Sequence, residues 1–241
     1  MPRNNPYTLE ICASSPDAVA ACAGIADRIE LCSALDLGGL TPDIGMMELA
    51  ASLGIETHVL IRSRSGDFAM TASDQATAVT SIRAARAIGL KGVVIGAESN
   101  GALDRRSLET LVAAADGLDI TLHRVIDVVD DPFAALEVAI DLGIRRVLSS
   151  GAASSAIEGI AGLDRLHAAA AGRIEIMAGA GINSANLPVI MAKTRLTAFH
   201  TSCTRVEAAK PHYAKLGFGT TQRSIDLTEL DRLARLCHKL S

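Results

Sequence analysis

The sequence predicts a single (β/α)8 barrel, or TIM barrel, with an extra helix at the C-terminus. Short apolar segments alternate with longer Ala- and Leu-rich segments along the 241 residues. The short segments begin roughly 19 to 35 residues apart, which is the length of one βα unit. Several are apolar throughout, as parallel strands covered by helices are. Barrels of this kind form one domain of about this length, so the whole chain, 1–241, is expected to be one domain.

Eight strands are predicted at the apolar segments, each followed by a helical stretch. They are Thr8–Cys12, Asp27–Cys32, Glu56–Arg62, Lys91–Ala97, Asp119–Val125, Arg145–Ser149, Arg173–Ala178 and Thr197–His200. A doubly wound open sheet is the alternative arrangement, but no G-x-G-x-x-G pattern follows the first strand. Beyond residue 204 the pattern is less regular, and it ends in an amphipathic stretch, Leu227–Leu240, that is expected to form a closing helix.

Residues that start and stop helices lie between the predicted strands. Ser15-Pro16-Asp17 supplies an N-cap, a proline at the first helical position and an early acidic residue. Asp131-Pro132 repeats this device. Glycines that suit helix C-caps follow five helical stretches, at Gly24, Gly54, Gly89, Gly117 and Gly143. These signals support an alternation of strand and helix along the chain.

The composition excludes several classes of protein. A hydrophobic content of 49% and a mean hydropathy of +0.29 exclude a disordered chain. A net charge of -4, only 2% aromatic residues and no Trp argue against a nucleic-acid partner. No apolar run reaches the ~18 residues of a membrane span, so no membrane partner is expected. The N-terminal stretch lacks an apolar signal-peptide core, and the five cysteines are an odd number, so reduced thiols in the cytoplasm are expected.

Ionisable and thiol side chains gather at the C-terminal ends of the predicted strands, where barrels of this class carry their chemistry. They are Glu10, Cys12, Glu30, Cys32, His58, Arg62, Arg64, His123, Arg124, Asp127, His200 and Cys203. Residues two apart on a strand share a face, so the two E-x-C segments each present a carboxylate and a thiol together. Because adjacent strands lie ~4.8 Å apart, Cys12 and Cys32 are expected to approach each other.

Several motifs in order along the chain resemble those of the CutC-type copper homeostasis family. They are E-x-C at two successive strands, GGLTP at 38–42, I-R-x-R-x-G-D-F at 61–68, T-x-H-R-x-x-D at 121–127, R-V-L-x-S-G at 146–151, I-M-A-G-A-G at 176–181 and H-x-S at 200–202. The resemblance runs from about residue 8 to about 205. The sequence departs from the family pattern at Ser63, Ser65 and Ala69, and the last of these leaves out a third thiol.

This resemblance implies a fold, a role and a metal. The family adopts a TIM barrel, which agrees with the repeat of strands and helices, and it has been linked to copper tolerance. Cu(I) is the implied ligand of cysteines at its first two strands, which correspond here to Cys12 and Cys32. Two thiolates suit this soft ion. The resemblance also implies self-association as a homo-oligomer.

A TIM-barrel enzyme is the second functional class that the residues support. Carboxylates and an imidazole around one opening can exchange protons with a substrate, and the candidates for this role are Glu10, Glu30, His123 and Asp127. An anion would be held by guanidiniums, hydroxyls, an imidazole and glycine loops. These candidates are Arg62, Arg64, Arg124, Ser150, Gly151, Gly179, Gly181, His200 and Ser202. The enzyme would be an isomerase, lyase or hydrolase acting on a small anionic, phosphorylated or sugar-like metabolite, without a nucleotide cofactor.

Structural roles are the alternative for each of these groups. Cys12 and Cys32 can be buried small hydrophobic residues, since free cysteine is often buried. The charged groups can form a network that only closes the top of the barrel, and the glycines can be ordinary tight turns. A third class, a non-catalytic interaction scaffold, would require an exposed apolar patch.

Overall fold

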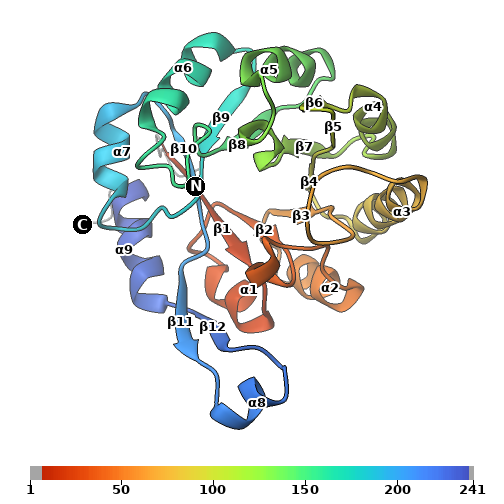
Figure 1. Cartoon of the computed structure of the whole chain (residues 1–241). Coiled ribbons are helices and arrows are strands. Elements are labelled where there is room, and N and C mark those ends of the chain that lie inside the picture. The colour runs from red at the N-terminus through yellow and green to blue at the C-terminus, as the bar shows by residue number, and fades with distance from the viewer. Residues whose placement is uncertain (1–6, 239–241) are drawn as a thin grey trace.

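The structure, a computed structural model, describes residues 7–238 and forms the predicted barrel (Figure 1). Eight parallel strands close on themselves in the order β1-β10-β9-β8-β7-β4-β3-β2. Their bounds are β1 Thr8–Ala13, β2 Arg28–Leu31, β3 Thr57–Leu60, β4 Gly92–Ile95, β7 Asp119–Leu122, β8 Arg146–Ser149, β9 Glu175–Ala178 and β10 Ala198–Thr201. Each observed strand lies inside a predicted segment or extends one residue beyond it, so the prediction of eight strands is confirmed.

One helix follows each barrel strand in the described part of the chain, and the helices surround the sheet (Figure 1). Their bounds are α1 Pro16–Cys22, α2 Ile44–Ser52, α3 Ala72–Ile88, α4 Arg105–Ala114, α5 Pro132–Asp141, α6 Ile160–Ala170, α7 Leu187–Lys193 and α9 Leu227–His238. The closing helix α9 packs against β1 and α7 and is the eighth of the ring. The predicted stretch extends to Leu240, which lies outside the described residues.

The local chemistry of the helix ends follows the sequence signals. Ser15 Oγ accepts a hydrogen bond from Ala18 N at 3.2 Å, and a proline occupies the first turn of α1. Asp131 caps α5 by accepting from the backbone nitrogen of Ala134 at 3.0 Å. Gly89 ends α3 with φ at +89°, a left-handed conformation that favours glycine.

Several smaller elements lie outside the barrel sheet and the ring of helices. Two short helices follow barrel strands, η1 (Leu35–Leu37) and η2 (Arg124–Asp127), and a two-stranded sheet joins β5 (Glu98–Ser99) to β6 (Ala102–Leu103). A hairpin of β11 (Thr204–Ala208), α8 (Pro211–Lys215) and β12 (Thr221–Ile225) projects from the barrel before α9 (Figure 1). Among the described helices, none is both long enough and apolar enough to cross a membrane.

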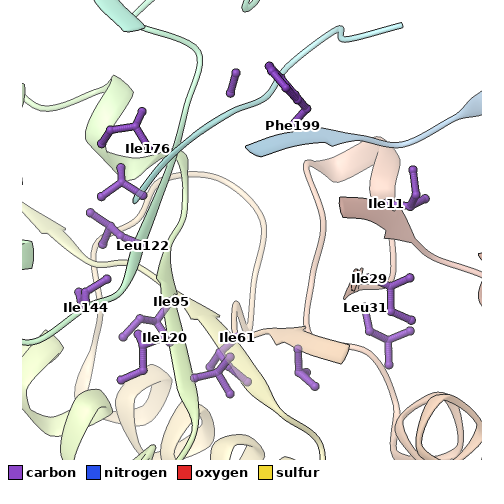
Figure 2. Close-up of a cluster of buried hydrophobic side chains, with 14 of the residues drawn as sticks. Ile11, Ile29, Leu31, Ile61, Ile95, Ile120, Leu122, Ile144, Ile176 and Phe199 are labelled. Carbon is purple, nitrogen blue, oxygen red and sulfur yellow. The ribbon is translucent and has the colours of Figure 1, made fainter. Parts of the chain in front are cut away.

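The hydrophobic core lies between the sheet and the helices (Figure 2). Alternate strand residues point outward into it, and the largest of these side chains are fully buried, among them Leu9, Ile11, Ile29, Leu31, Ile95, Leu122 and Phe199. The other face of each strand points into the barrel. That interior is unusually polar, because Glu10, Arg28, Glu30, His58, Thr121, His123 and Arg146 are all buried.

Candidate functional site

A cavity of about 140 Å³ opens at the C-terminal end of the barrel. Strands β1, β2, β3, β8 and β10 and the loops after β2, β3 and β7 contribute to its wall. Its lining residues are Cys12, Glu30, Leu35, Gly38, Leu60, Arg62, Phe68, His123, Arg124, Leu148 and His200. The structure therefore brings together six of the predicted site residues, which come from segments far apart in the sequence. Cys32, a seventh, lies directly behind this wall in contact with Cys12.

The two thiols lie side by side. Cys12 Sγ is 3.3 Å from Cys32 Sγ, and Cys12 also donates to Glu30 Oε1 at 3.6 Å. Both cysteines are buried, and they pack with Leu60 and Val94 inside the barrel. The contact with Cys32, the burial and the charge of Glu30 raise the pKa of the Cys12 thiol. Without a metal, Cys12 is therefore held as a thiol rather than as a thiolate.

Three different kinds of ligand atom converge beside this pair. One atom each of Cys12, Glu30 and His200 lies within 4.8 Å of the other two, a separation at which all three could hold one metal ion. With Cys32 in contact with Cys12, the cluster offers two sulfurs, a carboxylate and an imidazole. This set is rich in soft donors, which favours Cu(I) or zinc over magnesium or calcium.

Glu10 lies beneath this cluster and joins two charged partners. It is fully buried on β1, paired with Arg28 of β2 on one side and with His200 of β10 on the other. The Nδ1 atom of His200 is 2.7 Å from Glu10 Oε1. Burial alone would raise the pKa of Glu10, but Arg28 and His200 outweigh it and hold the pKa well below its usual range. Glu10 is thus a permanent carboxylate.

The two cavity groups next to Glu10 have shifted protonation equilibria. Burial works to lower the pKa of His200, yet the nearby carboxylates of Glu30 and Glu10 outweigh it and raise that pKa. Burial raises the pKa of Glu30, although His200 opposes the shift, and this favours its protonated form. A proton-carrying carboxyl and an imidazole with a neighbouring carboxylate are the groups that general acid–base chemistry uses.

An arginine and two rings form the opposite wall of the cavity. The ring of Phe68 lies 4.6 Å from that of His123, and the guanidinium of Arg62 lies 5.2 Å from the centre of the Phe68 ring. Arg62 donates to the carbonyl oxygens of Gly39 at 3.0 Å and Gly66 at 2.7 Å. Its Nε is buried without a hydrogen-bond partner, and no described carboxylate pairs with it. Arg62 therefore brings a positive charge to the cavity, which, among the described residues, only the more distant charge of Asp67 offsets.

His123 occupies the barrel interior in its neutral form. Burial, together with the charge of Arg62, lowers its pKa to about 3. Gly96 makes room for the ring, since a Cβ atom at that position would lie 2.6 Å from His123 Nε2. His123 Nδ1 accepts a hydrogen bond from the backbone nitrogen of Val125 at 3.1 Å, which fixes the orientation of the ring.

Asp127 lies outside the cavity wall and takes part in a network on the rim. Its carboxylate accepts hydrogen bonds from Ser149 Oγ at 2.6 Å, Ser150 N at 2.9 Å and Ala152 N at 3.1 Å. It also pairs with Arg124, whose Nε is 2.8 Å away. The backbone donors expected to hold a substrate anion in this loop therefore hold a carboxylate of the protein itself.

The remaining predicted anion-binding residues do not line the cavity. Arg64 pairs with Asp67 and Asp74 on the exposed loop after β3. Ser202 Oγ is 2.9 Å from Thr204 Oγ1, at the start of the projecting hairpin. Their predicted role in anion binding stays a prediction.

Two of the three predicted site glycines have close neighbours. A Cβ atom on Gly151 would lie 2.8 Å from the backbone nitrogen of Leu163, so the loop packs tightly onto α6. A Cβ atom on Gly179 would reach Leu148 inside the barrel at 2.5 Å. Gly181 has φ at +69°, which favours glycine whatever the space. Close packing and backbone conformation therefore account for all three glycines.

Sequence reasoning missed two residues of this site. Arg28 is the buried partner of Glu10, and Phe68 forms a wall of the cavity. Arg28 lies two residues before Glu30 on the same strand, so the alternation already placed both on the inner face. Phe68 ends the I-R-x-R-x-G-D-F motif, and only the folded loop brings it over His123.

The sequence model of the CutC family matches residues 7–205. The chain belongs to the CutC family. The CutC protein of Agrobacterium fabrum is 45% identical over 242 residues, covering 97% of this chain and 96% of that protein. The CutC protein of Caulobacter vibrioides (strain NA1000 / CB15N) is 48% identical over 196 residues, with 80% of each chain covered.

Solved structures support the same assignment. The structure of a protein described as a copper homeostasis protein CutC, from Streptococcus agalactiae, matches with a TM-score of 0.77 and 29% identity. The match covers 81% of this chain and 98% of that chain. An aldolase, QR15, shares the barrel with a TM-score of 0.61 at 14% identity, which shows the fold alone. The CutC match ends inside β11, so most of the projecting hairpin and α9 lie beyond it.

Proposed function

We propose that this chain is a copper homeostasis protein that binds Cu(I) at the mouth of the barrel, with Cys12 and Cys32 as ligands. The observation that carries the proposal is the distance of 3.3 Å between the two sulfurs. Thiolates are the ligands that select Cu(I), and two of them in contact offer one ion a shared site. The relative from Streptococcus agalactiae is described as a copper homeostasis protein, which supports the same role.

The surroundings of the thiols fit a soft ion. Cu(I) must displace the thiol proton, and the raised pKa of Cys12 makes this step dependent on pH. Glu30 and His200 lie beside Cys12 and would complete the coordination. Leu60 and Val94 pack against the sulfurs and limit the approach of water. Affinity for Cu(I) is therefore expected to rise with pH.

A competition titration tests this proposal. The reduced protein, without oxygen, is titrated with Cu(I) against a coloured Cu(I) chelator, and binding of about one ion per chain is expected. The double variant Cys12→Ser with Cys32→Ser is expected to abolish this binding. Cys22→Ala with Cys237→Ala is the matched control, because both residues are buried away from the cavity. Unchanged binding in the first double variant would remove the copper site.

The proposal also includes a compartment and an assembly. We place the protein in the cytoplasm, where free cysteines stay reduced, and all five cysteines are free thiols here. On the family resemblance we expect a homo-oligomer that binds a metal or small molecule and has no nucleic-acid or membrane partner. Light scattering and fractionation of cells test these two points.

Arg62 favours a second candidate function, catalysis on a small anionic metabolite. Its charge faces the cavity without a carboxylate partner, and an anionic substrate would neutralise it. Glu30 would then donate a proton and His200, oriented by Glu10, would accept one. The substrate would be a phosphorylated or sugar-like compound undergoing isomerisation, elimination or hydrolysis.

A metabolite screen separates the two functions. Compounds that raise the melting temperature of the protein are assayed for turnover with and without Cu(I). Turnover that Glu30→Gln abolishes, and that Cys32→Ser leaves intact, would favour the enzyme. Turnover unaffected by Glu30→Gln would count against the assigned acid.

A further inference from the structure

A second group of polar side chains lies at the opposite end of the barrel from the cysteines. His58 of β3 is fully buried, and neither of its ring nitrogens has a hydrogen-bond partner. Asp119, the first residue of β7, has a buried Oδ1 that is also without a hydrogen bond. Both residues line a cavity of about 640 Å³ at the N-terminal ends of β3, β4 and β7.

Two neighbouring orphan groups require a physical explanation. Buried polar atoms in folded proteins almost always have a partner, and an exception points to a strained site, a bound water or a bound ion. An imidazole without any partner is costly, because it has lost its hydrogen bonds to water. Here the imidazole and the carboxylate face the same cavity, so one occupant can satisfy both.

The side chains around His58 form a set of nitrogen and oxygen donors. The Nε2 atom of His58 lies 3.8 Å from Glu56 Oε1 and 3.9 Å from Asp119 Oδ2. These separations are too long for hydrogen bonds and leave space between the imidazole and each carboxylate. Glu56 is half-exposed, so its side chain can turn toward a shared occupant.

The carboxylates of Glu56 and Asp119 each have a guanidinium nearby. Arg28 lies 3.8 Å from Glu56, and Arg146 lies 3.6 Å from Asp119. Each of these guanidiniums makes a closer ion pair elsewhere, Arg28 with Glu10 and Arg146 with Glu175. The two cavity carboxylates are therefore only partly neutralised from inside the barrel.

Two cations approach the same carboxylates from the solvent side. Arg145 is largely exposed and lies 3.8 Å from Asp119 Oδ1, and Lys91 lines the cavity. Burial and the charge of Arg28 lower the pKa of His58 to about 4, so its imidazole is neutral at physiological pH. Neutral imidazole is the form that ligates metal ions.

Gly92 on the neighbouring strand gives His58 its position. A Cβ atom on Gly92 would lie 2.6 Å from His58 Nε2, so any other residue would displace the ring. A glycine inside a strand weakens the strand and often marks a close approach of another group. Here that group is the imidazole.

We infer that His58, Asp119 and Glu56 form a second metal site, for a borderline divalent cation such as Zn²⁺, at the end of the barrel opposite the cysteines. One imidazole and two carboxylates suit such ions, whereas the thiol pair suits Cu(I). The cation would satisfy the orphan nitrogen of His58 and draw the two carboxylates together. The two ends of the barrel would then hold ions of different softness.

The experiment uses the full chain with Cys12→Ser and Cys32→Ser, so that the two thiols at the barrel mouth cannot contribute. Binding of Zn²⁺ is measured by calorimetry. Co²⁺ serves as a spectroscopic probe, and its spectrum should lack a thiolate charge-transfer band because Cys12 and Cys32 are absent. One ion per chain is expected. His58→Asn and Asp119→Asn should each weaken binding by more than about tenfold. His212→Asn, on the exposed α8, is the matched control and should bind as the background does.

A second measurement guards against variants that fail to fold. In the Cys12→Ser, Cys32→Ser chain without further substitutions, Zn²⁺ should shift the imidazole nitrogen signals of His58 in an NMR spectrum and leave those of His212 unchanged. No binding in the Cys12→Ser, Cys32→Ser background, or binding that survives both substitutions, would overturn the inference. Because this background lacks the Cu(I) ligands, loss of the copper proposal and loss of the second site are separate results.

Discussion

The carboxylate of Glu10 lies 2.7 Å from Nδ1 of His200, although 190 positions separate the two residues in the chain. Closure of the barrel creates this contact, because β1 is hydrogen-bonded to β10 on one side and to β2 on the other. Glu10 forms ion pairs with His200 of β10 and with Arg28 of β2 across these two strand pairings. The same carboxylate thus secures the barrel and orients an imidazole at the cavity.

Removal of the Glu10 charge should change both the imidazole and the stability. In Glu10→Gln, the pKa of His200 should fall, because one of the carboxylates that raise it is gone. Arg28 would lose its buried partner, and the free energy of unfolding should fall by about 3–5 kcal/mol. NMR titration of the imidazole and urea unfolding measure the two effects.

Glu56→Gln is the matched control for that variant. Glu56 is half-exposed and lies 3.8 Å from the same arginine, so its loss should change the free energy of unfolding by less than about 1 kcal/mol. A His200 pKa that does not move in Glu10→Gln would show that Glu10 does not set the charge of the cavity.

Much of the fold follows from the sequence, because its signals are local. Each barrel strand is a short apolar segment, and each predicted segment overlaps one. The approach of Cys12 to Cys32 was also predictable, since both cysteines lie at the ends of adjacent strands, and the sulfurs meet at 3.3 Å. Periodicity and position along the strand were sufficient for these results.

Contacts that depend on the stagger between strands could not be predicted from the sequence. The register pairs Glu10 with Arg28 and Cys12 with Glu30, and no spacing in the chain specifies that offset. The turn η2 likewise carries Asp127 away from the cavity and into the loop after β8. A residue at a strand end can therefore belong to the rim network rather than to the cavity, and only the backbone path decides.

Gly96→Ala should destabilise the barrel through a clash with His123. The new Cβ atom would lie 2.6 Å from Nε2 of the ring, and the ring is held inside the barrel by Phe68. Overpacking of this kind costs about 1–3 kcal/mol in the free energy of unfolding. Chemical denaturation of the variant measures this loss.

A second substitution tests the cause of that loss. His123→Ala in the Gly96→Ala chain removes the clashing ring, so the double variant should be more stable than the sum of the two single effects predicts. Strict additivity would mean that Gly96 and His123 do not interact in this way.

His123 should make the protein less stable in mild acid. Its folded pKa is about 3, against 6.5 for an ordinary histidine, so the unfolded chain binds more protons between these two values. The contribution is complete above about pH 6.5 and is lost as pH falls toward 3, by up to about 1.4 kcal/mol per pH unit. Unfolding free energies measured from pH 7 to pH 5 should show this slope.

His123→Gln provides the comparison for the pH experiment. The variant lacks the titrating ring but keeps Arg62 and Phe68, which face it, so its slope should be shallower than that of the native chain. His58, with a pKa of about 4, contributes equally to both chains and cancels in the difference. Equal slopes would contradict a buried neutral His123.

Asp127→Asn distinguishes a structural carboxylate from a catalytic one. The carboxylate accepts hydrogen bonds from Ser149, Ser150 and Ala152. In the variant, the amide NH2 group would face some of these donor groups and could not accept their hydrogen bonds. The free energy of unfolding should fall by about 1–3 kcal/mol. Affinity for Cu(I) should stay the same, because Asp127 does not line the cavity. Native stability combined with weaker copper binding, or with lost turnover, would return Asp127 to the functional site.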